Sequence, residues 1–92
     1  MSWTYLVAVD NTIDLMLLIT ALDREPAIDN WFMIMGTAVI VTSGLDAGGV
    51  ARVVRKHTKN RRFIVVDLDT DRNGWLHRSA WDFIRNSGPT EE

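Results

Sequence analysis

Apolar residues gather into short segments along the chain, separated by polar or turn-forming residues. The first segment, Trp3–Val9, is continuous and rich in β-branched and aromatic side chains, which predicts a strand. Apolar residues then recur at helical spacing over residues 12–22, which predicts a helix. The pair Asp10 and Asn11 precedes that helix and suits its N-cap.

The next apolar segments predict a hairpin, a fourth strand and a closing helix. Residues 30–35 and 37–43 form two apolar runs that meet at Gly36, the natural position for a tight turn between strands. Residues 63–68 are β-branched and aromatic and predict the fourth strand. Residues 78–85 predict a short helix near the end of the chain.

A second helix is predicted after Asp46, with its inner face along Ala47, Val50, Val54 and His57. The adjacent glycines of its first turn each weaken the helix by about 1 kcal/mol relative to alanine. Such glycines also permit the close approach of a backbone or a phosphate, but we favour the simpler interpretation of a merely tolerated pair.

The resulting order is strand, helix, strand, strand, helix, strand, followed by a terminal helix. This order predicts an α+β fold of the ferredoxin-like β-α-β-β-α-β kind, an antiparallel sheet with two helices on one face and an extra C-terminal helix. Residues 1–86 are expected to form a single domain, and residues 87–92 a flexible tail. Both alternating sets of strand side chains are apolar, so the second face of the sheet needs a cover. A second copy of the chain and the C-terminal helix are the two candidates.

Composition narrows the protein class. The chain has 92 residues, of which 47% are hydrophobic, enough for the core of one small domain. It has no cysteine, which excludes disulfides and thiolate metal sites. The apolar stretch 13–19 is too short to span a bilayer, and the start of the chain lacks a basic signal region. We therefore expect a cytoplasmic protein without a membrane partner.

The net charge of −2 hides a marked segregation of charge. Basic residues crowd one short stretch that includes the end of the second predicted helix, and their helical spacing would let several follow a phosphate backbone. A solvated helix face is the alternative interpretation. The candidate nucleic-acid-binding residues are Arg52, Arg55, Lys56, Lys59, Arg61 and Arg62.

Residues 69–76 read D-x-D-x-N-G-x-L, which matches the first half of an EF-hand calcium loop. Asp69, Asp71 and Asn73 would be the ligands. The twelfth position of that loop should be a bidentate glutamate, but it is Ala80 here, and a strand rather than a helix leads into the loop. We therefore favour a polar loop that leads into the last helix over a calcium site.

Several residues resemble a pattern found in the small bacterial proteins often called SinR-like. The matching features are a tryptophan that opens the second strand, a small-residue–threonine turn, an apolar strand that ends in threonine and a late Gly-Trp-Leu. They correspond to Trp31, Gly36-Thr37, Thr42 and Gly74-Trp75-Leu76. These proteins are similar in fold to the CRISPR-associated Cas-two nucleases and the virulence-associated protein D ribonucleases. The resemblance implies a homodimer that acts on RNA or DNA.

In those relatives a carboxylate ends the first strand at the dimer axis, and Asp10 occupies the matching place. The resemblance thus implies that Asp10 is catalytic and binds Mg²⁺ as part of a metal-dependent endonuclease. Capping of the following helix is the structural interpretation of the same residue, and it needs no partner. The chain lacks the tyrosine-rich stretch and the neighbouring arginine or serine of the relatives, which leaves room for a weak or inactive enzyme.

Three functions therefore stay open. The first is a homodimeric nucleic-acid-associated protein, the second a non-catalytic interaction or regulatory module, and the third a calcium-binding domain. Four tryptophans are expected to fill the core or an interface, with Trp75 and Trp81 pinning the last helix to the sheet rather than stacking on bases.

The incomplete EF-hand pattern predicts that Ca²⁺ binds no more tightly than about millimolar, because the loop lacks its bidentate glutamate and its entering helix. Isothermal titration calorimetry with Ca²⁺ checks this expectation. A micromolar affinity would show that Asp69, Asp71 and Asn73 form a true site.

Overall fold

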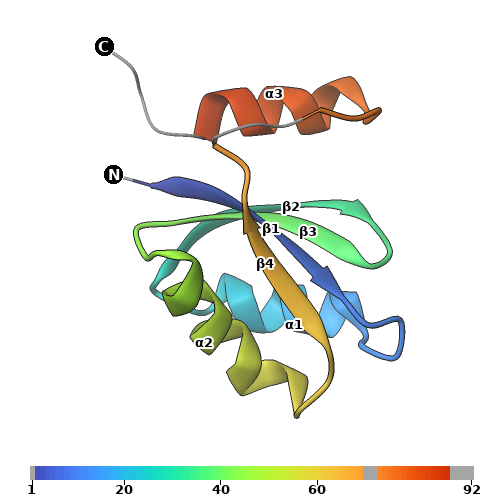
Figure 1. Cartoon of the computed structure of the whole chain (residues 1–92), viewed down its shortest axis with the longest axis vertical. Helices are drawn as coiled ribbons and strands as arrows, with labels where there is room; N and C mark the ends of the chain where they lie inside the picture. The colour runs from blue at the N-terminus through green and yellow to red at the C-terminus, as the bar shows by residue number, and fades with distance from the viewer. Residues whose placement is uncertain (1, 70–72, 88–92) are drawn as a thin grey trace.

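The computed structural model describes residues 2–69 and 73–87, which form a four-stranded antiparallel sheet and three helices of the α+β class (Figure 1). In chain order the elements are β1 (Trp3–Val9), α1 (Leu15–Asp23), β2 (Ile28–Met35), β3 (Ala38–Ser43), α2 (Ala47–Thr58), β4 (Phe63–Asp67) and α3 (Arg78–Ser87). The predicted bounds of the first strand are confirmed, and the other predicted elements are present with no end shifted by more than three residues.

The N-cap of α1 is Asp14, and the prediction that Asp10 caps this helix is wrong. The Asp14 side chain accepts hydrogen bonds from the backbone N–H groups of Met16 and Leu17. Asp10 instead accepts one from the backbone N–H of Thr12 at 2.9 Å, in the loop before the helix. Asp14 directly precedes the apolar run that begins at Leu15, whereas Asn11 and Thr12 separate Asp10 from the first apolar residue. The helix begins with that run, so Asp14 rather than Asp10 caps it.

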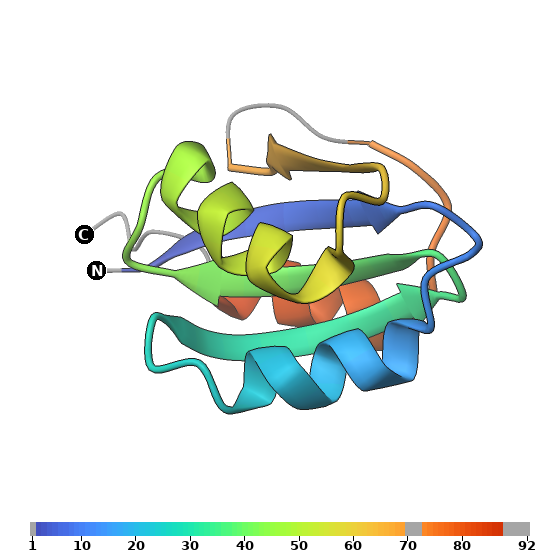
Figure 2. The same cartoon turned by 90° about the horizontal axis from the view of Figure 1, so that it is seen from below.

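The strands lie in the order β2-β3-β1-β4 across the sheet (Figure 2). The central strand β1 pairs with β3 on one side and with β4 on the other, both antiparallel. Helices α1 and α2 cover one face of the sheet, while α3 lies across the opposite face (Figure 1). The edges of the sheet are therefore β2 and β4.

The main core lies between the sheet and the pair α1 and α2. Alternate residues of the central strands, Val7 and Val39 among them, pack there with Leu22 and Val54, and these four side chains are completely buried. Glycine is required at position 49 of α2, because a Cβ there would lie 2.8 Å from the Cβ of Leu45. The interpretation of this glycine as merely tolerated is wrong.

Helix α3 covers part of the second apolar face of the sheet. Its Ala80 and Ile84 are buried, and the rings of Phe83 and Phe32 lie 5.4 Å apart. Trp81 lines a small cavity of about 170 Å³ beneath the helix. Of the two covers that the sequence allowed for this face, the described structure contains the C-terminal helix.

The prediction that Trp75 pins α3 to the sheet is wrong, because this side chain is 94% exposed. Ser87 is the last residue of α3 rather than part of a tail. The rest of the predicted tail, residues 88–92, lies outside the described residues. No described helix has the length and apolarity needed to cross a membrane.

Two leucines of α1 provide a test of this core. Leu22 is completely buried, whereas Leu17 is 69% exposed. Leu22→Ala should lower the free energy of unfolding by about 3 kcal/mol, because it removes buried methyl groups and leaves a cavity. Leu17→Ala on the same helix should change it by less than about 0.5 kcal/mol. Urea denaturation of both variants measures the difference, and equal losses would contradict the packing described above.

Candidate nucleic-acid interface

Helix α2 separates its apolar and basic residues onto two sides. Val50 and Val54 are buried against the sheet, whereas Arg52, Arg55 and Lys59 are exposed. Asp46 caps the helix by accepting a hydrogen bond from the N–H of Gly49 at 2.8 Å. Basic side chains in the last turn are favoured by the negative end of the helix dipole. The local sequence thus favours both the helix and its positive C-terminal end.

The chain leaves α2 through two consecutive residues in the left-handed region. Lys59 has φ 52° and Asn60 has φ 67°. The backbone N–H of Arg61 then donates to the carbonyl of Thr58 at 3.1 Å, and the chain enters β4. This tight turn places Arg61 and Arg62 directly beside the basic end of α2.

One of the predicted phosphate contacts is already occupied. Lys56 Nζ lies 3.1 Å from Glu25 Oε2, and His57 Nε2 lies 2.7 Å from the same oxygen. The hydrogen bonds from His57 and Lys56 hold the pKa of the Glu25 carboxyl below its ordinary value. The Lys56 side chain therefore links α2 to the loop after α1 through this salt bridge.

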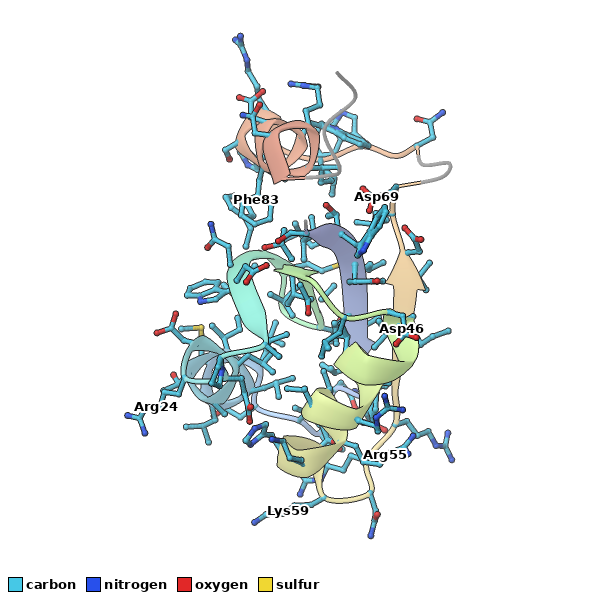
Figure 3. All side chains as sticks on the ribbon, turned by 90° about the vertical axis from the view of Figure 1, so that its left-hand side faces the viewer. Arg24, Asp46, Arg55, Lys59, Asp69 and Phe83 are labelled. Carbon is cyan, nitrogen blue, oxygen red and sulfur yellow. The ribbon has the colours of Figure 1, made fainter. Side chains whose placement is uncertain are left out.

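An open groove of about 590 Å³ runs between α2 and β4, and three arginines line it. They belong to Arg55, Arg61 and Arg62. The guanidinium carbon of Arg55 stands 5.8 Å from the centre of the Phe63 ring, a cation–π contact. Figure 3 shows Arg55 and Lys59 at the same end of the molecule, away from α3. Arg55, Arg61 and Arg62 thus share this groove, and Lys56 faces Glu25. Lys59 lines the neighbouring cavity beside α1, and Arg52 lies near Gly48 in the first turn of α2.

Asp10 lies at the end of β1, next to this basic region. Its backbone N–H donates to the carbonyl of Arg62 at 2.9 Å, and Arg61 Nη1 donates to the carbonyl of Thr12 at 2.9 Å. Hydrogen bonds from the backbone and side chain of Thr12 lower the pKa of the Asp10 carboxyl, and the charges of Arg62 and Arg61 lower it further. Asp10 is therefore ionised at neutral pH, in a local field that is positive.

A magnesium site at Asp10 needs more ligands than the described residues of one chain place there. The described residues contain no group of three or more His, Cys, Asp or Glu side chains placed to hold a metal ion. One oxygen of Asp10 already accepts the Thr12 N–H, and the arginine charges nearby oppose a second cation. The residues of one chain therefore do not fit Mg²⁺ there.

The acidic loop after β4 uses its carboxylates to hold the backbone. Asp69 Oδ2 accepts a hydrogen bond from the Thr4 N–H at 2.8 Å, and Asp67 Oδ1 accepts one from the Asp69 N–H at 2.7 Å. Asn73 Oδ1 accepts from the N–H of Gly74 at 2.7 Å. Asp71 lies outside the described residues. The part of the loop that is described thus secures the start of β1.

Three carboxylates act on the Tyr5 hydroxyl in β1. Burial raises the pKa of this hydroxyl, and the charges of Asp67, Asp46 and Asp69 raise it further. Figure 3 places Asp46 and Asp69 nearer to α3 than Arg55 and Lys59 are. These two carboxylates therefore lie away from the basic end of α2, whereas Asp10 and Glu25 lie beside it.

No protein-family model, curated protein or solved structure shows significant similarity to the chain.

The Glu25 cluster predicts a pH-dependent stability. Because the pKa of Glu25 is lowered by folding, its ionised form stabilises the protein above its ordinary pKa of 4.5, and this contribution is lost as the pH falls below that value. Thermal unfolding should show the wild type melting at a higher temperature than Glu25→Gln near pH 6. The difference should shrink toward pH 3, and a difference independent of pH would contradict the ion-pair explanation.

Proposed function

We propose that the protein associates with nucleic acid and binds the phosphate backbone through the exposed basic side of α2. The α2 cations, defined as Arg52, Arg55 and Lys59, carry this proposal, because none of them forms a salt bridge with any described residue. Unpaired cations keep their full attraction for phosphate and release counterions when they bind it. Lys56 is excluded from this set by its pairing with Glu25.

The spacing of the α2 cations suits a polyanion better than a single small anion. From Arg52 to Lys59 the helix rises about 10 Å, close to three phosphate steps along one strand of a duplex. Arg62, in the adjoining groove, extends the positive surface toward β4. Contacts of this kind position a protein on the backbone without reading bases, so we expect little sequence preference.

The acidic net charge is compatible with this function because two of the carboxylates, those of Asp46 and Asp69, lie nearer to α3 than Arg55 and Lys59 do. A polyanion is repelled by these carboxylates and attracted to Arg55 and Lys59. This partial separation would favour the approach of a nucleic acid toward the C-terminal end of α2.

We also propose that the arrangement is of the ferredoxin-like kind. The order β1-α1-β2-β3-α2-β4 along the chain supports this, as does the sheet order, in which β3 separates β1 from β2. The basic surface then lies on the helices of that fold and does not involve the sheet face covered by α3.

Replacing Arg52 and Lys59 together by alanine should weaken binding for all sequences alike. It should also flatten the dependence of log K on log salt by about two units, one for each lost phosphate contact. The matched control is Lys56→Ala on the same helix, which should leave the slope nearly unchanged because Lys56 is paired with Glu25. Fluorescence anisotropy with labelled RNA and DNA at several salt concentrations measures both effects.

The same assay with Mg²⁺ and gel analysis separates binding from cleavage. Asp10→Asn keeps the shape of the side chain but removes its charge, so binding should persist and any Mg²⁺-dependent cleavage should disappear. If the wild type shows no salt-sensitive association with either nucleic acid, the protein is better described as a non-catalytic interaction module.

A further inference from the structure

The strand β4 forms an edge of the sheet with a free row of backbone groups. The Leu68 N–H donates to the carbonyl of Thr4, and the Asp10 N–H donates to that of Arg62, so even-numbered residues of this segment face β1. In an antiparallel ladder the alternate residues point the other way. Phe63, Val65 and Asp67 therefore direct their N–H and carbonyl groups outward, and no described strand pairs with them.

This edge lacks several of the features that normally prevent pairing. The run from Phe63 to Asp67 contains no proline, lysine or bulge, and its Ile64 and Val66 are 58% and 40% exposed. The opposite edge, β2, differs: its pairing with β3 has two register irregularities. Asn30 in β2 also bonds the backbone N–H of Trp31 with its own side chain. One edge of the sheet is protected and the other is open.

The charges around β4 change sign along the strand, from basic before it to acidic at its end. Residues 61–69 read R-R-F-I-V-V-D-L-D, with two arginines before the apolar centre and two aspartates after it. A second copy placed antiparallel, with Val65 opposite its own counterpart, brings the basic end of each strand beside the acidic end of the other. A parallel copy would instead place like charges together. The segment is therefore complementary to itself in one orientation only.

From this geometry we infer that two copies of the chain pair through β4, antiparallel and centred on Val65, to form one continuous eight-stranded sheet. Phe63 then stands opposite Asp67 of the partner subunit, and each such outward-facing pair exchanges two N–H···O bonds. Ile64 stands opposite Val66 of the partner subunit on the α3 side, which covers both exposed aliphatic side chains. Arg55, above Phe63, comes close to the partner's Asp67.

This dimer goes beyond the proposed function and does not rest on it. It sets two α2 helices on the same face of the joined sheet, which would double the basic surface. It also keeps Asp10 near the Arg62 end of β4, away from the two-fold axis at Val65. Such a dimer therefore differs from the one that the resemblance implies, in which the two carboxylates meet at the axis.

Sedimentation velocity and light scattering at about 100 μM test the interface. We expect the wild type to have twice the 10.4 kDa mass of one chain. Ile64→Lys, which adds a charge to an exposed position of β4, should raise the dimer dissociation constant at least about tenfold. Met35→Lys, an equally exposed apolar position on β2, should leave the dimer intact. Circular dichroism verifies that both variants fold.

A cysteine crosslink tests the register. The chain has no cysteine, so Val65→Cys introduces a single thiol. Across the inferred axis its Cα would lie about 5.5 Å from its counterpart, within disulfide range. Mild oxidation should give a covalent dimer, whereas Ser79→Cys, exposed on α3, should not. A monomeric wild type, or a dimer that survives Ile64→Lys and does not crosslink at position 65, would overturn the proposal. Loss of nucleic-acid binding alone would leave it standing.

Discussion

Both faces of the sheet are apolar, and the chain covers one with α1 and α2 and the other, in part, with α3. The central strand β1 depends most on this cover, because it is paired on both edges and carries buried side chains such as Tyr5 and Val7 toward α1 and α2. On the other face Thr4 is buried as well. Because β1 has neighbours on both edges and both faces, its burial constrains where α2, β4 and α3 can pack.

That enclosure explains how charge is distributed. Polar side chains excluded from the two apolar layers collect at the ends of the strands and on the outer side of α2. At one end, the side chain of Asp69 accepts a hydrogen bond from the Thr4 N–H. At the other end, the backbone carbonyl of Arg62 accepts one from the Asp10 N–H. The strand ends that complete the β1–β4 ladder thus also carry charged residues, Asp69 at one end and Arg62 with Asp10 at the other.

Local patterns were enough to predict the elements, because strand and helix periodicity depends on neighbouring residues. The seven elements and the covered second face followed from the sequence. The pairing of Lys56 with Glu25 did not, since the two residues are 31 positions apart and no short-range rule connects them. The cap at Asp14 and the exposure of Trp75 were missed for a related reason. Each depends on where the loop lies relative to the sheet, which a linear pattern does not encode.

The interpretation of Asp10 as a catalytic, metal-binding residue shows the same limit of prediction from a linear pattern. Its position at the end of the first strand is correct, yet the sequence placed Arg61 and Arg62 among phosphate ligands without revealing that they lie beside this carboxylate. A motif identifies the residue type at a strand end. Only the folded arrangement reveals the electrostatic field in which that residue works.

The left-handed turn at Lys59 and Asn60 has a consequence for the side chains of β4. The turn sets the phase between the last residue of α2 and the first of β4. A slip of β4 by one residue against β1 would turn every side chain of β4 to the opposite side of the sheet. Ile64 and Val66 would then point at α2, and Phe63 and Val65 would lose their place against the core. The geometry of this turn therefore decides which side chains of β4 meet the core and which stay exposed.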